Sequence, residues 1–286
     1  MIGMHTLFYA PEKPLFSDLQ YFEFSYSPEH ITCRDTQIRE IYAFIHPGRK
    51  KNRPLVAVIR GLPGTGKTMC INRALRQAGA RSHTIVPVYF NGHESLTSFE
   101  MYEDIYYTLS RPASSYQKFS HDILPSRIRL LLQEKNAFLV IHLADAHRYL
   151  LDGVLNSVLQ SLLRLNDTFP VPRVRILLSA GMPPDNLMNN LDPAIRSTFN
   201  DKEIYFPVYS REEVSHILRE RVTMGLNPGV MPEESFELIV NTTVLKNDLR
   251  TGIELVRSSV IQAEMNAREM VDTSDVMKAT GDYYHL

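Results

Sequence analysis

The sequence predicts an α/β protein in which a doubly wound, parallel, five-stranded sheet is followed by a small all-α domain. Apolar runs alternate with helical patterns up to residue 206, and such alternation is typical of parallel strands joined by helical crossovers. A glycine-rich loop stands between the first apolar run and the helical segment after it. From Pro207 onward the patterns are helical only. We therefore expect two domains, an α/β core with an N-terminal lead-in over residues 1–206 and a helical domain over residues 207–286.

Each expected element follows from local periodicity or from residues that start or stop a helix. Residues 1–30 carry many aromatic residues and prolines without a clean period, which indicates an extended, packed lead-in. Strands are expected at 55–59, 84–90, 137–144, 174–179 and 203–206. Helices of the core are expected at 33–45, 69–76, 98–109, 126–134 and 155–165. In the helical domain, a capping box at 210–213 and a proline at 232 begin two helices, and further helices are expected at 249–267 and 273–279.

The loop after the first strand has the phosphate-binding pattern G-x-x-x-x-G-K-[ST], written here as GLPGTGKT from Gly61 to Thr68. Its glycines let the backbone approach oxygen atoms closely, and the helix after it offers unpaired N–H groups. Lys67 is expected to reach the β and γ phosphates, and the Thr68 hydroxyl is an expected Mg²⁺ ligand. The pattern therefore predicts binding of ATP or ADP with Mg²⁺. The expected contacts in this segment are Gly61, Pro63, Gly64, Thr65, Gly66, Lys67, Thr68 and Met69.

A single acid, Asp145, ends the third strand, where an ATPase with such a loop usually carries two consecutive acids. The first of these holds the Mg²⁺ shell and the second polarises the attacking water. If Asp145 takes the first place, Ala146 stands in the second; if it takes the second, Ala144 stands in the first. The spacing to Tyr149 favours the former arrangement. Asp145 is an expected Mg²⁺ ligand and catalytic residue. In both arrangements we expect impaired hydrolysis with intact nucleotide binding.

Other polar residues near the strand ends have weaker assignments. His142 and His147 flank the acid, but no third ligand stands at matching spacing, so we expect His142 to pack in the sheet and His147 to be solvated. A polar residue that contacts the γ phosphate or the attacking water is expected near the end of the fourth strand. Ser179 and Asn186 are the candidates.

Composition limits the possible partners and location. The net charge is −1, so the overall charge does not require a polyanion as partner, and the basic run at 49–53 is expected to be a solvated loop. Cys33 and Cys70 lack metal-ligand spacing and are expected to be reduced. Neither an export signal nor a membrane-spanning run is indicated. We expect no membrane partner and a cytoplasmic protein, or a nuclear one in a eukaryote.

Several short motifs outside the loop occur together in the order and spacing of a known family. They are Tyr26-Ser-Pro28, Arg34-Asp-Thr-Gln-Ile38, Leu191-Asp-Pro193, Phe206-Pro-Val-Tyr209, Ile217-Leu-Arg-Glu-Arg221 and Asn247-Asp-Leu-Arg250. With the phosphate-binding loop, they make residues 16–280 resemble the archaeal origin-recognition and cell-division-cycle replication initiators, which are AAA+ ATPases. The resemblance implies a P-loop AAA+ module with a helical lid domain, and nucleotide-dependent switching in origin recognition and helicase loading.

The resemblance also implies roles for residues beyond the loop. Tyr209 and Arg221 are expected to lie against the nucleotide from the lid side. Arg250 is expected to reach the γ phosphate as a sensor arginine, a role that suits its planar fork. The family places an arginine that acts on a neighbouring subunit just after Leu-Asp-Pro. Here Ala194 has that place, and Arg196, two positions on, is the candidate.

The implied partners are replication-origin DNA and other initiator subunits or the replicative helicase. Members of the family carry a C-terminal winged-helix domain that binds DNA, whereas this sequence ends at Leu286, so either it is a fragment or the protein is naturally short. Without that domain, we expect weak DNA binding by this chain. A second hypothesis is a hydrolysis-deficient, ATP-liganded regulatory or scaffold subunit without its own origin recognition. A small-molecule kinase is disfavoured, because nothing resembles a substrate lid with paired arginines.

Overall fold

The computed structural model describes residues 14–46, 55–82, 84–94, 97–110, 120, 122–151, 153–181, 184–198 and 202–283. The chain divides into two compact units, which are described separately. The sheet unit comprises 34–62 and 66–206, and the helical unit takes the described residues up to Cys33, from Pro63 to Thr65, and from Pro207 onward. One boundary between the two units falls after Phe206. The lead-in differs, because residues 14–33 group with the helical unit and not with the α/β core.

The sheet has five strands, all parallel, as the sequence predicts. Its strands are β1 (Val56–Arg60), β2 (Ile85–Asn91), β3 (Phe138–Ala144), β4 (Val174–Ala180) and β5 (Glu203–Tyr205), in the order β2-β3-β4-β1-β5. In a parallel sheet the carboxyl ends of all strands share one edge, so the loop after β1 and the residues after β2 and β3 emerge at the same edge.

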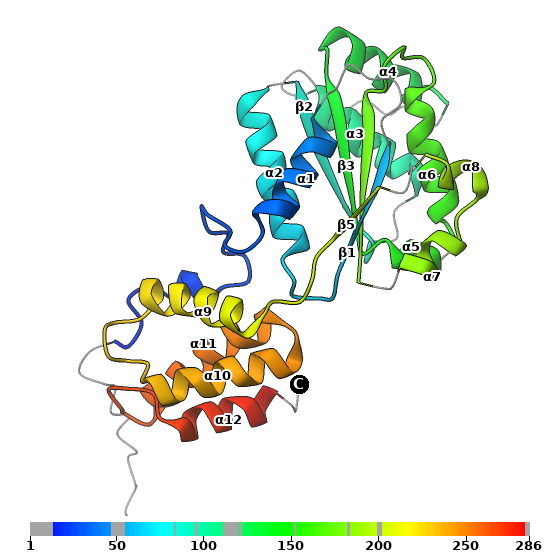
Figure 1. Cartoon of the computed structure of the whole chain (residues 1–286). Helices are drawn as coiled ribbons and strands as arrows, with labels where there is room; N and C mark the ends of the chain where they lie inside the picture. The colour runs from blue at the N-terminus through cyan, green and yellow to red at the C-terminus, as the bar shows by residue number, and fades with distance from the viewer. Residues whose placement is uncertain are drawn as a thin grey trace, which may run out of the picture. The chain divides into compact units, whose positions relative to one another are not determined.

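Helices cover both faces of this sheet. They are α1 (Asp35–Ile45), α2 (Lys67–Arg81), α3 (Ser98–Ser110), α4 (Leu124–Glu134), α5 (His147–Leu151), α6 (Leu155–Leu163), α7 (Pro184–Asn189) and α8 (Pro193–Arg196). A 3-10 turn, η2 (Arg164–Asn166), follows α6. Leu139, Ile141 and Leu143 of β3 join one core cluster with α3, α4 and α6. The alternate residues of β3 face the side that carries α1 and α2 (Figure 1). The short helices α7 and α8 were not expected from the sequence.

A buried arginine ties β4 to the carboxyl end of α1. Arg175 lies within β4 and is 4% exposed. Its guanidinium contacts the carbonyl oxygen of Phe44 and donates to that of His46 at 2.8 Å. A cation is stabilised at a helix carboxyl end, where carbonyl groups lack partners within the helix. The sequence pattern of β4, apolar on both sides of this residue, gave no sign of that role.

The helical unit combines helices from the end of the chain with a short N-terminal segment. Its described residues form η1 (Leu19–Phe22), α9 (Arg211–Gly225), α10 (Glu233–Lys246), α11 (Leu249–Met265) and α12 (Thr273–Tyr283). The capping box at the start of α9 is confirmed, with Ser210 and Glu213 each satisfying the other's backbone N–H. Residues 14–33 join this unit because Leu15 and Phe22 bury their side chains in its core, and because the Ser17 N–H donates to the Gly225 carbonyl at 2.9 Å.

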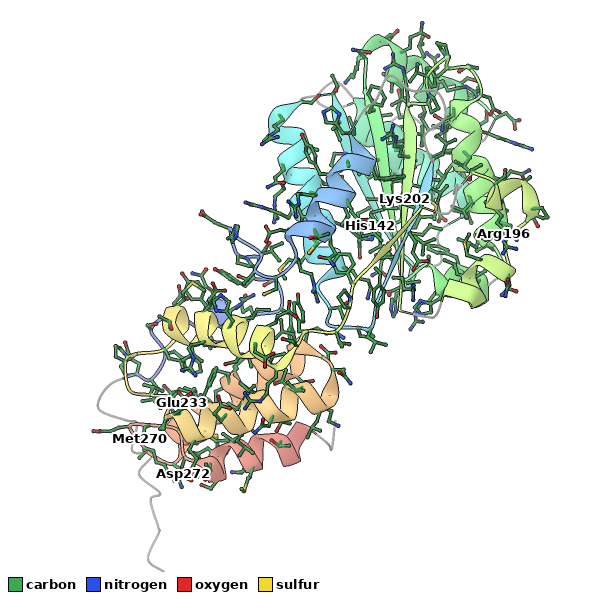
Figure 2. The ribbon with its side chains drawn as sticks, viewed as in Figure 1. His142, Arg196, Lys202, Glu233, Met270 and Asp272 are labelled. Carbon is green, nitrogen blue, oxygen red and sulfur yellow. The ribbon has the colours of Figure 1, made fainter. Side chains whose placement is uncertain are left out.

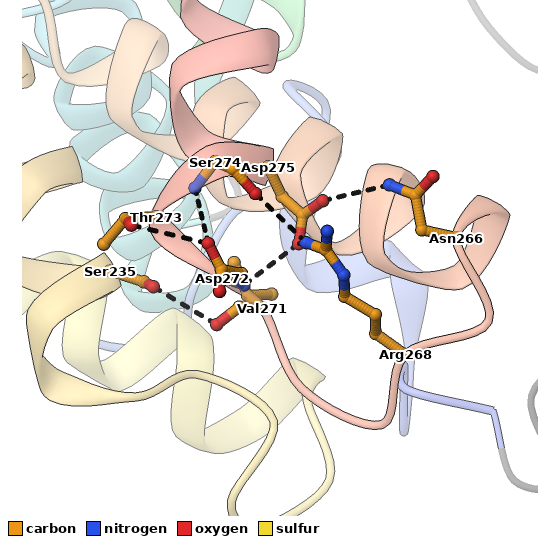
Figure 3. Close-up of polar contacts among 8 residues, drawn as sticks. All are labelled: Ser235, Asn266, Arg268, Val271, Asp272, Thr273, Ser274 and Asp275. Carbon is orange, nitrogen blue, oxygen red and sulfur yellow. Dashed lines mark hydrogen bonds and ion pairs between the residues drawn. The ribbon is translucent and has the colours of Figure 1, made fainter.

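A buried carboxylate fixes the connection between α11 and α12. Asp275 is 2% exposed and accepts from the Asp272 N–H at 2.9 Å, from Arg268 at 2.7 Å and from Asn266 at 3.2 Å (Figure 3). Asp272 in turn accepts from the Ser274 N–H at 2.8 Å and so begins α12. The Asp275 carboxylate therefore neutralises Arg268 and also accepts a hydrogen bond from a backbone N–H of the connection between the two helices.

Two expected loops fall largely outside the described residues. These are the basic run at 49–53 and most of the serine-rich segment 110–121. Cys33 and Cys70 form no disulfide bond. Burial raises the pKa of the Cys70 thiol to about 12, so this thiol is held protonated and unreactive. Within the described residues, no helix is both long enough and apolar enough to cross a membrane.

Candidate functional site

The glycine-rich loop has the strand–loop–helix setting that the sequence predicts. It leaves β1 after Arg60 and enters α2 at Lys67. Gly66 is the N-cap of α2 and has φ 87°, a left-handed conformation that a residue with a Cβ rarely adopts. Gly64 has φ 73°. Because Gly66 has no side chain to accept from the first turn, the N–H groups at the head of this helix point toward the loop without a side-chain cap.

The lysine of the loop lies over the loop's own backbone. Its Nζ donates to the Gly61 carbonyl at 2.7 Å and to the Leu62 carbonyl at 2.9 Å. An ammonium has three donors. Two are used to hold the side chain at the mouth of the loop, and the positive charge stands beside the head of α2. Thr68, in the first turn of that helix, is exposed. An anion with several oxygen atoms fits this arrangement of charge and N–H groups.

Asp145 follows β3 in a tight turn at the carboxyl edge of the sheet. It has φ 49°, which aspartate tolerates better than most residues. Gly92, just after β2, lies so close that an added Cβ would stand 2.6 Å from the Asp145 carbonyl oxygen. His93, the next residue, places Nε2 3.6 Å from Asp145 Oδ2. Sequence reasoning missed His93, although the shared edge of parallel strands brings residues after β2 and β3 together.

The two alanines beside Asp145 have different surroundings. Ala146 is fully buried in the core cluster with α3 and α6, so a carboxylate at this position would lie in the apolar core. Ala144 is the last residue of β3 and lies on the same face as His142, the face that α2 covers. Both alanines are buried, with Ala144 4% exposed, but only Ala146 belongs to that apolar core cluster.

The two histidines do not form a metal site with Asp145. His142 is 1% exposed and packs in the sheet, as expected, with Nε2 2.8 Å from the Ser179 hydroxyl. His147 is half-buried and not solvated, since it begins α5 against the end of β3. Ser179 is itself buried and its hydroxyl faces His142. Among the described residues, no three His, Cys, Asp or Glu side chains are grouped to hold a metal ion.

In the helical unit, the expected sensor arginine has a carboxylate partner. Asp248 is the N-cap of α11 and accepts from the Arg250 N–H at 2.9 Å. The same carboxylate binds the Arg250 guanidinium, with Nη2 2.7 Å from Oδ2. The Arg250 side chain is 54% exposed. An anion that attracts Arg250 therefore competes with Asp248 for its guanidinium.

Arg221 is buried, which is unusual for an arginine on a helix. Its Nη1 donates to the Tyr21 carbonyl at 2.7 Å, and its guanidinium stands 4.3 Å from the centre of the Tyr26 ring. Burial lowers the pKa of Arg221. Tyr209 is also buried, within the core of the helical unit. In the structure, Arg221 therefore holds the N-terminal segment to α9.

Arg196 ends the short helix α8 and is exposed. Figure 2 shows it among the helices on the face of the sheet opposite to α1 and α2. Lys67 belongs to α2, so these two site candidates of one chain lie on different faces of the sheet. Asn186, the other candidate at the end of β4, has a side chain outside the described set.

Comparison with known proteins identifies the family. One family model, the AAA domain, matches residues 50–198, and another, the Cdc6 AAA+ ATPase-type lid domain, matches residues 215–281. ORC1-type DNA replication protein 2 of Methanothermobacter thermautotrophicus is 32% identical over 275 residues, which are 94% of this chain and 72% of that protein. The chain belongs to the ORC1/Cdc6 family of AAA+ ATPases. Its fold and its sequence motifs agree on this point.

Solved structures of the ORC1/Cdc6 family share the fold. The Aeropyrum pernix ORC1 protein in complex with DNA has a TM-score of 0.77 at 22% identity, over 95% of this chain and 71% of that one. The ADP form of the Aeropyrum pernix ORC2 protein has a TM-score of 0.78 at 20% identity, over 94% and 73%. AAA+ ATPases use a nucleotide and Mg²⁺, and the loop from Gly61 to Thr68 with Asp145 supplies the donor types that such a ligand requires.

Proposed function

We propose that this ORC1/Cdc6-family protein binds ATP or ADP with Mg²⁺ at Gly61–Met69 and acts as a nucleotide-dependent switch in DNA replication initiation. The observation that carries the proposal is the loop at the head of α2, with Gly66 as a left-handed N-cap and the Lys67 ammonium held over it. Thr68 is the proposed Mg²⁺ ligand, and Asp145 is the proposed catalytic acid. The metal would neutralise phosphate charge, while Lys67 and the helix N–H groups orient the phosphates.

Calorimetry with ADP and Mg²⁺ tests the binding step. Lys67→Ala removes a cation that makes charge-assisted hydrogen bonds of about 1.5–3 kcal/mol each, so we expect at least about 30-fold weaker binding. Lys278→Ala, which removes an exposed lysine from α12, is the matched control and should bind as the wild type does. No heat of binding with the wild-type protein, in the presence of Mg²⁺, would refute the proposal.

We further propose that hydrolysis is weak because the site has one acid where two are usual. Ala146 lies in the apolar core cluster, whereas Ala144 ends β3 outside that cluster, and this supports the arrangement in which Asp145 is the water-polarising acid. Ala144→Asp is then expected to raise the turnover number. Ala146→Asp places a carboxylate in the core and is expected to destabilise the sheet unit instead. A higher turnover in Ala146→Asp, with the fold intact, would reverse the assignment.

The proposed role in replication rests on the family and includes residues of both units. Arg250 is proposed to reach the γ phosphate and Tyr209 and Arg221 to lie near the nucleotide, as the family resemblance implies. Arg196, exposed on α8, is proposed to act on a neighbouring subunit. Fluorescence anisotropy with duplex DNA, in ATP and in ADP, tests DNA binding. Affinity that is independent of both DNA sequence and nucleotide would count against an origin-recognition role for this chain.

A second candidate function is a regulatory or scaffold subunit that binds ATP and scarcely turns it over. The lone acid at Asp145 and the alanine at 194 favour it. Steady-state turnover separates the two functions. Turnover well above background that is lost in Asp145→Asn would exclude the scaffold, whereas stable ATP binding without turnover would support it.

A further inference from the structure

The carboxylate of Asp248 packs against a residue of the phosphate-binding loop. Pro63, Gly64 and Thr65 group with the helical unit, which also contains Asp248 and α11. Gly64 has φ 73°, and a Cβ added to it would overlap the Asp248 carboxylate and stand 3.1 Å from the Asp248 Cα. The loop pattern fixes no residue type at position 64. Glycine is required there by its left-handed backbone and by the carboxylate beside it.

The same carboxylate holds the guanidinium of Arg250. Asp248 Oδ1 accepts from Arg250 Nε at 3.1 Å and Oδ2 accepts from Nη2 at 2.7 Å, so the pair is bidentate. Oδ1 also accepts from the Arg250 backbone N–H at 2.9 Å, which makes Asp248 the N-cap of α11. The Asp248 side chain is 22% exposed and the Arg250 side chain 54%. One carboxylate therefore joins the loop, the head of α11 and Arg250.

A phosphate is recognised by arginine in the same way as a carboxylate. Each offers two oxygen atoms to one edge of the planar guanidinium. In the structure, the Arg250 edge formed by Nε and Nη2 is bound to Asp248. A phosphate that takes this edge must displace the carboxylate, because one edge cannot serve two anions at once.

We propose that Asp248 sets the selectivity of the nucleotide site between ATP and ADP. This inference rests on the proposed function, in which Arg250 reaches the γ phosphate. ATP binding then includes the free energy of separating Arg250 from Asp248, whereas ADP, which lacks the γ phosphate, leaves the pair intact. Asp248 is thus a positioning residue, which acts on the nucleotide through Arg250. The guanidinium has two alternative partners, and the γ phosphate decides between them, as a nucleotide-dependent switch requires.

Calorimetry with Mg²⁺ and either ADP or a non-hydrolysable ATP analogue tests this selectivity. Asp248→Asn keeps the size of the side chain and a good N-cap but removes the charge. The pair is partly exposed, so its loss is expected to tighten binding of the analogue by about 3- to 5-fold and to change the affinity for ADP by less than about 2-fold. Asp248→Ser, a second uncharged N-cap, should give the same change and guards against a folding defect particular to one variant.

Two further variants tie the change to Arg250. Glu254→Gln is the matched control, because it removes a negative charge from the same helix, where Glu254 pairs with Arg257 at 3.6 Å. It should leave the ratio of the two affinities unchanged. In an Arg250→Met background, Asp248→Asn should no longer tighten binding of the ATP analogue, since the carboxylate acts through the guanidinium. An undiminished gain in that background would overturn the proposal.

The same titrations distinguish failure of this inference from failure of the proposed function. Absence of binding of both nucleotides to the wild-type protein would refute the proposed function, and this inference with it. Binding of both nucleotides, with a ratio of affinities that stays the same in Asp248→Asn or shifts toward ADP, would overturn the inference alone. The proposed binding at the loop would then stand, and Asp248 would serve only as an N-cap.

Discussion

Replacing Arg221 with methionine separates its structural role from the role that the family resemblance implies. The guanidinium is 5% exposed, donates to the Tyr21 carbonyl at 2.7 Å and stands 4.3 Å from the Tyr26 ring centre. Methionine keeps most of the apolar stem and removes the charge. The change should therefore loosen residues 14–33 from α9 without opening a large cavity.

The size of the effect follows from the contacts. A hydrogen bond from a charged donor contributes about 1.5–3 kcal/mol, and a cation–π contact about 0.5–2 kcal/mol. Part of this loss of free energy is offset, because methionine removes a buried charge. Burial disfavours the charged guanidinium, as the lowered pKa of Arg221 shows. We expect a net loss of about 2 kcal/mol, which is about 30-fold in the equilibrium for opening the segment.

Hydrogen exchange of the N-terminal segment measures this directly. The Ser17 and Asp18 N–H groups both donate to the Gly225 carbonyl, so their exchange reports detachment of the segment from α9. The control is Arg211→Met, which removes an exposed arginine of the same helix, ion-paired with Glu237, and should change exchange by less than about 5-fold.

Nucleotide affinity measured on the same variants supplies the decisive comparison. If Arg221 acts through the segment, Arg221→Met raises exchange about 30-fold, and any loss of affinity for ADP follows from that opening. Unchanged exchange in Arg221→Met together with a large loss of ADP affinity would refute the reasoning. Arg221 would then contact the nucleotide directly, and its bond to the Tyr21 carbonyl would be dispensable.

Three further predictions concern stability. Burial lowers the pKa of His142 from 6.5 to about 4. Between these pH values the unfolded chain binds a proton at His142 that the folded chain does not bind. The free energy of unfolding should therefore fall by up to about 3 kcal/mol as the pH drops from about 6.5 to about 4. His142→Gln should remove this component, and identical pH profiles would contradict it. Asp275→Asn breaks the ion pair with Arg268 at the start of α12, and should lower the free energy of unfolding in denaturant by about 2–4 kcal/mol. The control Glu269→Gln changes an exposed side chain and should lower it by less than about 0.5 kcal/mol. Tyr102→Phe removes the 2.7 Å hydrogen bond from the Tyr102 hydroxyl to the Ser161 carbonyl, and should lower the free energy of unfolding by about 1 kcal/mol. An unchanged denaturation midpoint would show that this hydrogen bond does not stabilise the fold.

The elements that sequence patterns predict well are those set by local spacing. The strand expected at 55–59 is β1 at Val56–Arg60, and the helix expected at 249–267 is α11 at Leu249–Met265. The first is a continuous apolar run that ends before Gly61, and the second carries apolar residues at helical spacing after its N-cap, Asp248. The short helices α7 and α8 were not predicted, because six or four residues are too few to show a helical period.

The residues of the candidate site likewise include some that the sequence predicts and some that it does not. The loop from Gly61 to Thr68 was found from the sequence because its chemistry lies in consecutive residues. Spacing alone does not choose between Ala144 and Ala146 as the place of the second acid, and that Ala146 lies in the apolar core cluster is known only from the structure. His93 was missed, because its approach to Asp145 depends on which strands are neighbours.

By itself, the sequence determined the class of fold, the phosphate-binding loop and the family, since each of these rests on patterns within a few residues or on many short motifs in order. Only the tertiary structure decided that Arg221 is buried against residues 14–33, that Arg175 caps α1, and that His142 packs beside Ser179. The physical reason is that these contacts join residues far apart in the chain. Their partners are selected by strand order and packing, which no local pattern encodes.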